Sequence, residues 1–248
     1  MEIELPLIYG FNKSSEAGDD PFACSIFIGG CNMRCPYCMN MSIIDKKNMP
    51  LTTINIKNVK TYITENNVKN IMISGGEPTL IPHHDIINLI GQFKDMGCNV
   101  GISTNGTMPN KLSKILSYIN FVAMDIKTSS PGIYDQITIA GKRSSTSAAW
   151  NNLIYSHNII KEEHLCRDDF NYEIRTTLFP PFVKEDDIYN IGEKFVIEGD
   201  RWVLQQFRLT KMLKSCDVNG IIPYSIEKIE EFKVIAEKYT KKVIVRYV

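Results

Sequence analysis

The chain alternates short apolar runs with longer stretches in which apolar and polar residues are mixed. Most of these runs are nearly continuous, which is typical of strands in a parallel sheet that is covered on both faces. We predict strands at residues 23–28, 70–74, 99–104, 121–126, 172–178 and 201–207.

Between the predicted strands, apolar residues recur at the spacing of one helix face, for example at positions 56, 59, 62 and 63 and at positions 86, 89, 90 and 93. Strands that alternate with helices form right-handed parallel crossovers. We therefore predict an α/β fold, an incomplete (β/α)6 TIM-like barrel that occupies residues 1–248 as a single domain. A helix near 226–238, a strand near 243–247 and a short opening strand near 3–9 complete this prediction.

Composition narrows the possible partners and the compartment. The 28 Lys plus Arg equal the 28 Asp plus Glu, so no strong field is available for nucleic acid or an anionic membrane. No apolar run approaches the roughly 18 residues of a membrane span. The seven cysteines are odd in number and four are scattered, which argues against a disulfide framework and for a reducing cytoplasm. We expect a cytoplasmic protein.

A loop directly after the first predicted strand carries three cysteines, Cys31, Cys35 and Cys38, at C-x3-C-x2-C spacing. Three thiolates from one loop can hold three corners of a cubane iron–sulfur cluster and leave the fourth iron without a protein ligand. The alternative is structural zinc, which takes four closed ligands, commonly in C-x2-C pairs. Since the chain has no second cysteine pair, the spacing favours the cluster.

This spacing, the aromatic Tyr37 before the third cysteine and the glycines ahead of the first resemble the radical S-adenosylmethionine (SAM) superfamily. The resemblance implies one [4Fe-4S] cluster held by the three cysteines. It also implies that SAM chelates the open iron and is split by one electron into methionine and a 5'-deoxyadenosyl radical. Tyr37 would then pack near the adenine, unless it only covers the core. Met39 and Asn40 follow the loop and are expected beside the cofactor.

In such sheets the ligand site lies at the carboxyl ends of the strands. After the second predicted strand come Gly75, Gly76 and Glu77. Paired glycines let a ligand approach the backbone, and a carboxylate can accept hydrogen bonds from an ammonium group. The resemblance implies that this motif binds the SAM amine, although Gly-Gly-Glu-Pro also suits a turn.

The next two strands end in further polar residues. Ser103 and Asn105 suit ribose hydroxyls or the SAM carboxylate, or Asn105 merely forms a turn with its following glycine. Asp125 and Lys127 are costly to bury without partners, so we expect them to face a polar cavity.

The fifth predicted strand carries Arg175, which suits a carboxylate of SAM or a substrate backbone. Pairing with an internal acid such as Glu173 is the alternative. Two amides, Gln205 and Gln206, lie near the end of the sixth strand and could contact a peptide backbone or simply cap the barrel floor.

Together with these motifs, residues 73–80, 104–106, 124–127, 175–177 and 204–208 resemble glycyl-radical-enzyme activases, and more narrowly the anaerobic ribonucleoside-triphosphate reductase activating proteins. The resemblance implies that the partner is a glycyl radical enzyme that loses a hydrogen from one backbone glycine, and that a flavodoxin or ferredoxin supplies the electron. Met39 stands where related activases often have His. Ser103 stands where the pyruvate formate-lyase branch often has Asp, so a cation site on that carboxylate is not expected.

Three alternatives remain open. They are an activase of another glycyl radical enzyme, a small-molecule radical enzyme such as 7-carboxy-7-deazaguanine synthase, and a non-catalytic cluster or zinc protein. Asp125 and Lys127 together with Arg175 fit the activases better than the small-molecule enzymes. Residues 128–147, rich in Ser, Gly and Pro, are a candidate lid or docking surface. The isolated Cys98, Cys166 and Cys216 lack cluster spacing, so we expect no second cluster.

Overall fold

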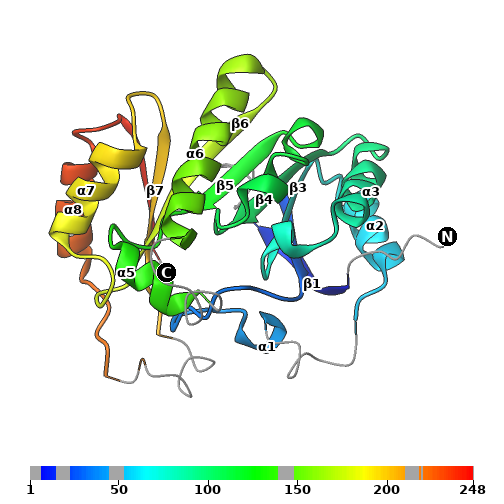
Figure 1. Ribbon diagram of the computed structural model, residues 1–248. Coiled ribbons are helices and arrows are strands. Elements are labelled where there is room, and N and C mark those ends of the chain that lie inside the picture. Colours follow the sequence, from blue (N-terminus) through cyan, green and yellow to red (C-terminus); the bar gives the residue numbers. More distant parts are fainter. Residues whose placement is uncertain are drawn as a thin grey trace.

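A computed structural model describes residues 7–14, 23–44, 53–138, 148–209, 218 and 220–247. Its centre is an eight-stranded sheet in the order β1 to β8. The strands are β1 Ile8–Ser14, β2 Ala23–Ile28, β3 Asn70–Gly75, β4 Asn99–Thr104, β5 Phe121–Asp125, β6 Asn171–Leu178, β7 Arg201–Gln206 and β8 Lys242–Arg246. β1 is antiparallel to β2, and every later neighbour is parallel. The sheet curves into the predicted incomplete barrel (Figure 1).

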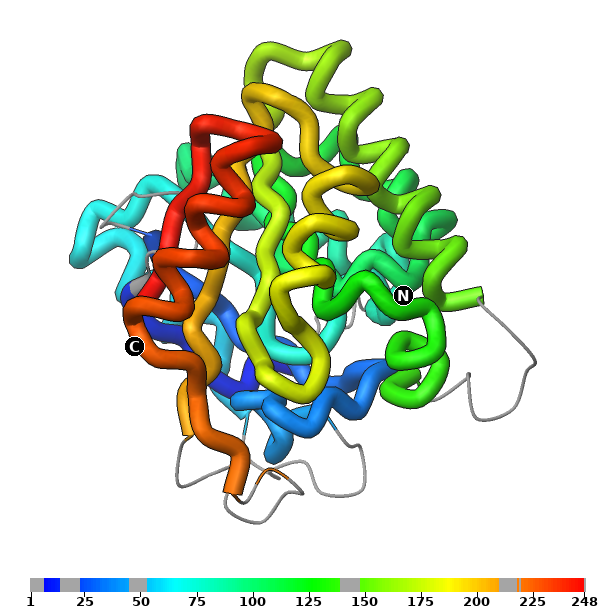
Figure 2. The backbone as a smooth tube through the Cα atoms, turned by 90° about the vertical axis from the view of Figure 1, so that its left-hand side faces the viewer, coloured from blue at the N-terminus to red at the C-terminus, as the bar shows by residue number. Residues whose placement is uncertain are grey.

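Helices connect the strands. They are α1 Met41–Ile44, α2 Ile56–Glu65, α3 His83–Lys94, α4 Pro109–Leu112, α5 Pro131–Ile137, α6 Ala148–Cys166, α7 Glu185–Phe195 and α8 Ile226–Ala236, with short 3-10 turns at Pro78–Leu80 and Leu116–Tyr118. Figure 1 shows α2 and α3 beside the first strands, α6 over the middle of the sheet, and α7 and α8 beside its last strands. Seen from the side, α8 and β8 lie next to α7 and β7 (Figure 2).

The burial of the strands explains why the sequence pattern predicted them. Ile71, Met72 and Ile73 of β3 are all fully buried, as are Val122 and Ala123 of β5, because both faces of these central strands are covered. Large apolar side chains from the helices, such as Phe93 of α3, complete the core. The six central strands and the last helix and strand are confirmed to within two residues.

Two expectations need correction. The opening strand runs over Ile8–Ser14 and not 3–9, and residues 1–6 lie outside the described part. It pairs antiparallel with β2 through its backbone, which needs no continuous apolar run. The 19-residue helix α6 was not located, because its buried face includes Ser156 and His157, which interrupt the apolar periodicity.

All the parallel strands point their carboxyl ends to the same end of the barrel. In register, Ile28 of β2 lies opposite Gly75 of β3, Thr104 of β4 opposite Met124, and Asp125 of β5 opposite Arg175. The loops that follow these strands therefore meet at one mouth. In the described part of the chain, no helix has the length and apolarity that crossing a membrane requires.

Candidate functional site

A cavity of about 870 Å³ lies at the carboxyl ends of the strands, and every residue predicted for the site lines it. These residues are Cys31, Cys35, Tyr37, Cys38, Met39, Asn40, Gly75, Gly76, Glu77, Ser103, Asn105, Asp125, Lys127 and Arg175. The structure thus brings together residues that are up to 144 positions apart in sequence, from Cys31 to Arg175 (175 − 31 = 144). Their roles toward a cofactor remain predictions.

The cavity extends farther than the sequence indicated. Asn12 and Lys13 of β1 line one side, and Arg246 and Tyr247 at the end of β8 line another. β1 and β8 are the two ends of the strand order, so the cavity reaches both edges of the open barrel. A sequence pattern carries no signal for this, because it depends on how far the sheet curves.

The cysteine loop is held by its backbone. Gly30 adopts φ 89°, which only glycine adopts easily, and its N–H donates to the carbonyl of Ile43 at 2.8 Å. The N–H of Cys31 donates to Ile44 at 3.2 Å, and the N–H of Cys38 donates to the carbonyl of Cys35 at 3.1 Å. These bonds fix a loop of otherwise irregular backbone.

Burial suppresses ionisation of the three thiols. It raises the pKa of Cys31 to about 11, with Glu77 adding to the shift. It also raises the pKa of Cys35 to about 11, although the ammonium of Lys127 acts in the opposite direction. The pKa of Cys38 is raised by burial as well. Metal ligation must therefore displace a proton from each thiol.

The paired glycines are required by packing between two loops. A Cβ on Gly76 would overlap the carbonyl oxygen of Gly30, and a Cβ on Gly75 would lie 2.6 Å from the carbonyl oxygen of Ile28. The N–H of Gly76 donates to Ile28 and that of Glu77 donates to Gly30, both at 2.8 Å. The end of β3 therefore lies directly against the cysteine loop.

The carboxylate of Glu77 is buried and accepts four hydrogen bonds. Its Oε1 accepts from the N–H of Thr79 at 3.1 Å, the hydroxyl of Thr79 at 2.6 Å and the hydroxyl of Thr104 at 2.7 Å. Its Oε2 accepts from the N–H of Asn105 at 2.7 Å. Burial raises the pKa of Glu77, and these donors oppose that shift. Glu77 thus ties the loop after β3 to the loop after β4.

Lys127 and Asp125 form an ion pair at the end of β5, with 2.9 Å between Nζ and Oδ2. Burial disfavours the ammonium, but Asp125, Cys35 and Tyr37 together outweigh this effect, and the pKa of Lys127 is raised well above its usual value. The N–H of Lys127 donates to the hydroxyl of the buried Tyr134 at 2.8 Å. The expectation that this pair lines a polar cavity is confirmed.

Arg175 pairs with Glu173 two residues earlier on β6, through its Nε and Oε1. Both side chains are almost fully buried. Arg201 and Arg246 also lie near this carboxylate, at 2.9 and 3.4 Å. The internal acid weighed from the sequence is therefore present, and Arg175 reaches the cavity wall from this pair.

The cavity offers what an iron–sulfur cluster and a polar cofactor require. Cys31, Cys35 and Cys38 carry free thiols in one wall. The buried hydroxyl of Tyr37 has no hydrogen-bond partner among the described residues, so it can serve a bound molecule, while its ring packs 4.8 Å from that of Phe179. No three His, Cys, Asp or Glu side chains in the described ranges converge on one metal position. A cubane needs no such convergence, because each thiolate binds a different iron.

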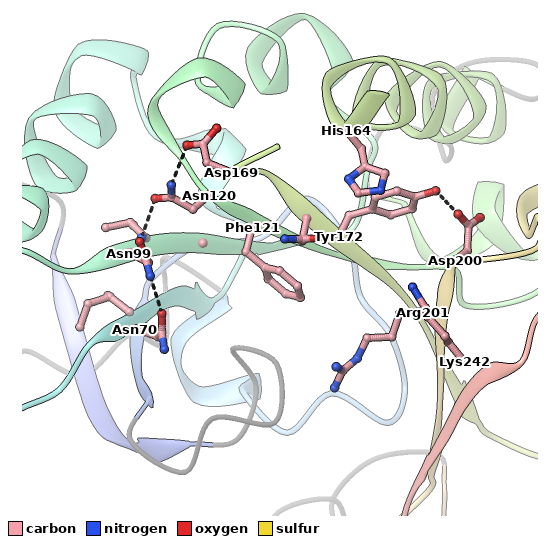
Figure 3. A pocket seen from close by; sticks show the side chains of 15 residues that line it. Asn70, Asn99, Asn120, Phe121, His164, Asp169, Tyr172, Asp200, Arg201 and Lys242 are labelled. Atoms are coloured by element: carbon pink, nitrogen blue, oxygen red, sulfur yellow. Dashed lines mark hydrogen bonds between the residues drawn. The ribbon is translucent and has the colours of Figure 1, made fainter. Parts of the chain in front are cut away.

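A second cavity, of about 730 Å³, lies at the amino ends of the same strands (Figure 3). Asparagines dominate one wall, where Asn99 donates to Asn70 at 3.1 Å and Asn120 donates to Asp169 at 3.1 Å. Arg201 and Lys242 form the opposite wall. No cysteine lines this cavity within the described residues.

Comparison with known proteins places the chain in a family. The sequence model of the Radical SAM superfamily matches residues 25–185. A protein of Methanocaldococcus jannaschii named "Putative glycyl-radical enzyme activating enzyme" is 30% identical over 224 residues, which are 89% of this chain and 87% of that protein. 7-Carboxy-7-deazaguanine synthase of Clostridium acetobutylicum is 34% identical over 99 residues, which are 39% of this chain and 42% of that protein.

A solved structure shares the fold. A domain of pyruvate-formate lyase-activating enzyme from Bacteroides vulgatus superposes with a TM-score of 0.53 at 14% identity, over 72% of this chain and 99% of that one. The superfamily match spans more than half of the chain and includes the cysteine loop. Membership implies a [4Fe-4S] cluster and SAM. The chain is an enzyme that belongs to the radical SAM superfamily.

Proposed function

We propose that this enzyme is an activase that cleaves SAM reductively and generates a glycyl radical on a partner enzyme, most specifically an anaerobic ribonucleoside-triphosphate reductase. The observation that carries the proposal is the single cavity in which the three cysteines and all the predicted SAM residues meet. The similarity to the M. jannaschii protein over 89% of the chain supports the partner class.

We assign the three cysteines as the cluster ligands. When bound there, the cluster would supply the electron that cleaves SAM, and a flavodoxin- or ferredoxin-type protein would be its electron donor. Around the cluster site, Gly75, Gly76 and Glu77 shape the wall for the methionyl part of SAM. Tyr37 offers its free hydroxyl and its ring. These residues bind, orient and exclude water, while the cofactor performs the redox step.

The remaining predicted residues complete the SAM wall. Met39 and Asn40 follow the third cysteine, and the Asn40 amide donates to the carbonyl of Gly75 at 2.8 Å. Ser103 lies on the ribose side, while the Asn105 amide is held by Asn32 and Thr107 and shapes the wall beside the cysteine loop. Lys127, held by Asp125, supplies positive charge for the SAM carboxylate together with Arg175.

The reach of the cavity to both sheet edges supports a protein substrate. Lys13 on β1 and Arg246 on β8 both line the cavity, and β1 and β8 are the end strands of the sheet, so the cavity extends from the cysteine loop to the unclosed side of the barrel. A glycine loop needs such an entry, because a backbone hydrogen must come close to the radical. We also propose one domain, since β7 and β8 continue the sheet beyond residue 185.

The test is electron paramagnetic resonance (EPR). The anaerobically reconstituted protein is mixed with SAM, a reductant and the anaerobic ribonucleotide reductase of the same organism. We expect a glycyl-radical doublet on the reductase. SAM cleavage without a doublet would contradict the ribonucleotide reductase assignment. If pyruvate formate-lyase also gave no doublet, the second candidate, a small-molecule enzyme, would be favoured, in line with the 99-residue match to 7-carboxy-7-deazaguanine synthase.

A further inference from the structure

The side chain of Asn105 has a fixed orientation. Its Oδ1 accepts from the backbone N–H of Thr107 at 3.0 Å and from the Thr107 hydroxyl at 2.6 Å. A backbone N–H can only donate, so the carbonyl oxygen of the amide must face Thr107. The Nδ2 group of Asn105 therefore points the other way.

That direction leads to the cysteine loop. Nδ2 of Asn105 lies 2.9 Å from Oδ1 of Asn32 and 3.9 Å from Sγ of Cys31. Asn32 in turn donates to the hydroxyl of Thr107 at 2.7 Å, which closes a ring of three side chains. The backbone N–H of Asn105 is held by Glu77 at 2.7 Å. Asn105 is thus fixed at its backbone and at its amide, with 5% of its surface exposed.

The sulfur of Cys31 consequently faces two N–H donors. The backbone N–H of Met33 is 3.4 Å away within the loop, and the Asn105 amide approaches from the end of β4. A thiolate accepts hydrogen bonds more strongly than a thiol, so both contacts strengthen when Cys31 becomes a cluster ligand.

We propose that Asn105 donates an N–H···S hydrogen bond to the Cys31 thiolate and thereby raises the reduction potential of the cluster. The inference rests on the proposed function, because it requires Cys31 to be a cluster ligand. Hydrogen bonds to the sulfurs stabilise the more negative, reduced cluster and are an established means of tuning potential. Asn105 is therefore a positioning residue that acts through Cys31.

The test compares two amide-to-leucine changes in the same ring. The reduction potential of the reconstituted full-length protein is measured by EPR-monitored redox titration for the wild type, Asn105→Leu and Asn32→Leu. Asn105→Leu removes the donor, so its midpoint potential is expected to be more negative than that of the wild type. Asn32→Leu removes the competing acceptor, so the Asn105 amide can donate to the Cys31 sulfur alone. The midpoint potential of this variant is therefore expected to equal that of the wild type or to be less negative.

Loss of local polarity alone would move both variants in the negative direction, and that result would overturn the proposal. An unchanged potential in Asn105→Leu would also overturn it. If a variant takes up no iron, hyperfine spectroscopy of wild-type protein with 15N in its asparagine side chains decides. A 15N coupling to the reduced cluster is expected, and its absence would contradict the proposal.

The same experiments distinguish the role of Asn105 from the proposed function of the enzyme. A wild-type protein without a cluster signal would contradict the proposed function. A wild-type protein that carries a cluster and cleaves SAM, with an unchanged potential in Asn105→Leu, would contradict only the role of Asn105.

Discussion

The two cavities at opposite ends of the barrel are similar in size, about 870 and 730 Å³, but differ in how their polar groups are arranged. At the carboxyl end, Glu77 is 1% exposed and accepts four hydrogen bonds beside three free thiols. At the amino end, the exposed Asn99 donates to Asn70, and Asn120 donates to Asp169. Cavity volume therefore does not mark the functional end. The functional end is marked instead by a buried, hydrogen-bonded carboxylate, that of Glu77, next to three thiols.

The largest effect is expected from substitutions in the cavity that carries the three cysteines. Cys35→Ser removes a predicted iron ligand, so cluster content and 5'-deoxyadenosine formation should fall to background, as measured by iron analysis and chromatography. The control is Cys98→Ala, since Cys98 is buried outside the cavity. That variant should keep both. Equal losses in the two variants would mean that any cysteine change disturbs the protein.

Alanine substitutions at Gly76 and at the control position Gly91 test the contact between the cysteine loop and the end of β3. Gly76→Ala forces a Cβ against the carbonyl of Gly30, so we expect the unfolding free energy to fall by about 3 kcal/mol and SAM cleavage to fall with it. Gly91→Ala is the matched control, because a Cβ at Gly91 in α3 meets nothing within 4 Å. This change should stabilise the protein by about 0.5–1 kcal/mol. Urea unfolding measures both, and a harmless Gly76→Ala would refute the packing argument.

A buried histidine tests the layer behind the amino end of the sheet. His157 of α6 packs against Tyr172, which lines the second cavity, at the amino ends of the strands. Burial, aided by the charge of Lys161, lowers the pKa of His157 from 6.5 to about 4. Above pH 6.5 both folded and unfolded states hold it neutral. As the pH falls from 6.5 to 4, only the unfolded state takes up the proton, so stability is lost, by about 3 kcal/mol at most.

His157→Phe should therefore lose less stability than the wild type between pH 7 and pH 4, as followed by urea unfolding at each pH. The exposed His83, at the start of α3, provides the control His83→Gln, which should follow the wild-type curve. An unchanged acid sensitivity in His157→Phe would assign the effect to other groups.

The smallest effect is expected in the second cavity, at the amino ends of the strands. Asn120→Ala removes one hydrogen bond to Asp169 and one from the N–H of Val100, which should cost about 1 kcal/mol of stability. The rate of SAM cleavage should not change. A clear loss of cleavage would show that the two ends of the barrel are coupled, and the functional contrast between them would fail.

The sequence predicted the barrel because its central strands are covered on both faces and read as apolar runs, as in Ile71–Ile73. It predicted the cavity wall because parallel strands end on one side, which brings Cys31 and Arg175 together. It explained Gly75 and Gly76 by the close approach of a ligand and did not indicate their packing against Ile28 and Gly30, which lie more than 40 residues away (75 − 30 = 45).

Other features could not be predicted for similar reasons. The contributions of Lys13 and Arg246 depend on the curvature of the sheet, which leaves no local pattern. The predicted lid at 128–147 is described only in part: its first residues form the loop before α5 and α5 itself, and 139–147 lie outside the described residues, as does Cys216. Of the isolated cysteines, Cys24 and Cys98 are buried and Cys166 is exposed.

We propose above all that the cysteine loop holds the cluster with which this enzyme cleaves SAM. This proposal is tested most directly by incubating anaerobically reconstituted wild-type protein and Cys35→Ser with SAM and dithionite and quantifying 5'-deoxyadenosine. We expect 5'-deoxyadenosine from the wild type and none above background from the variant. A wild-type protein with a full cluster content that forms no 5'-deoxyadenosine, or a Cys35→Ser variant that forms it at the wild-type rate, would contradict the account.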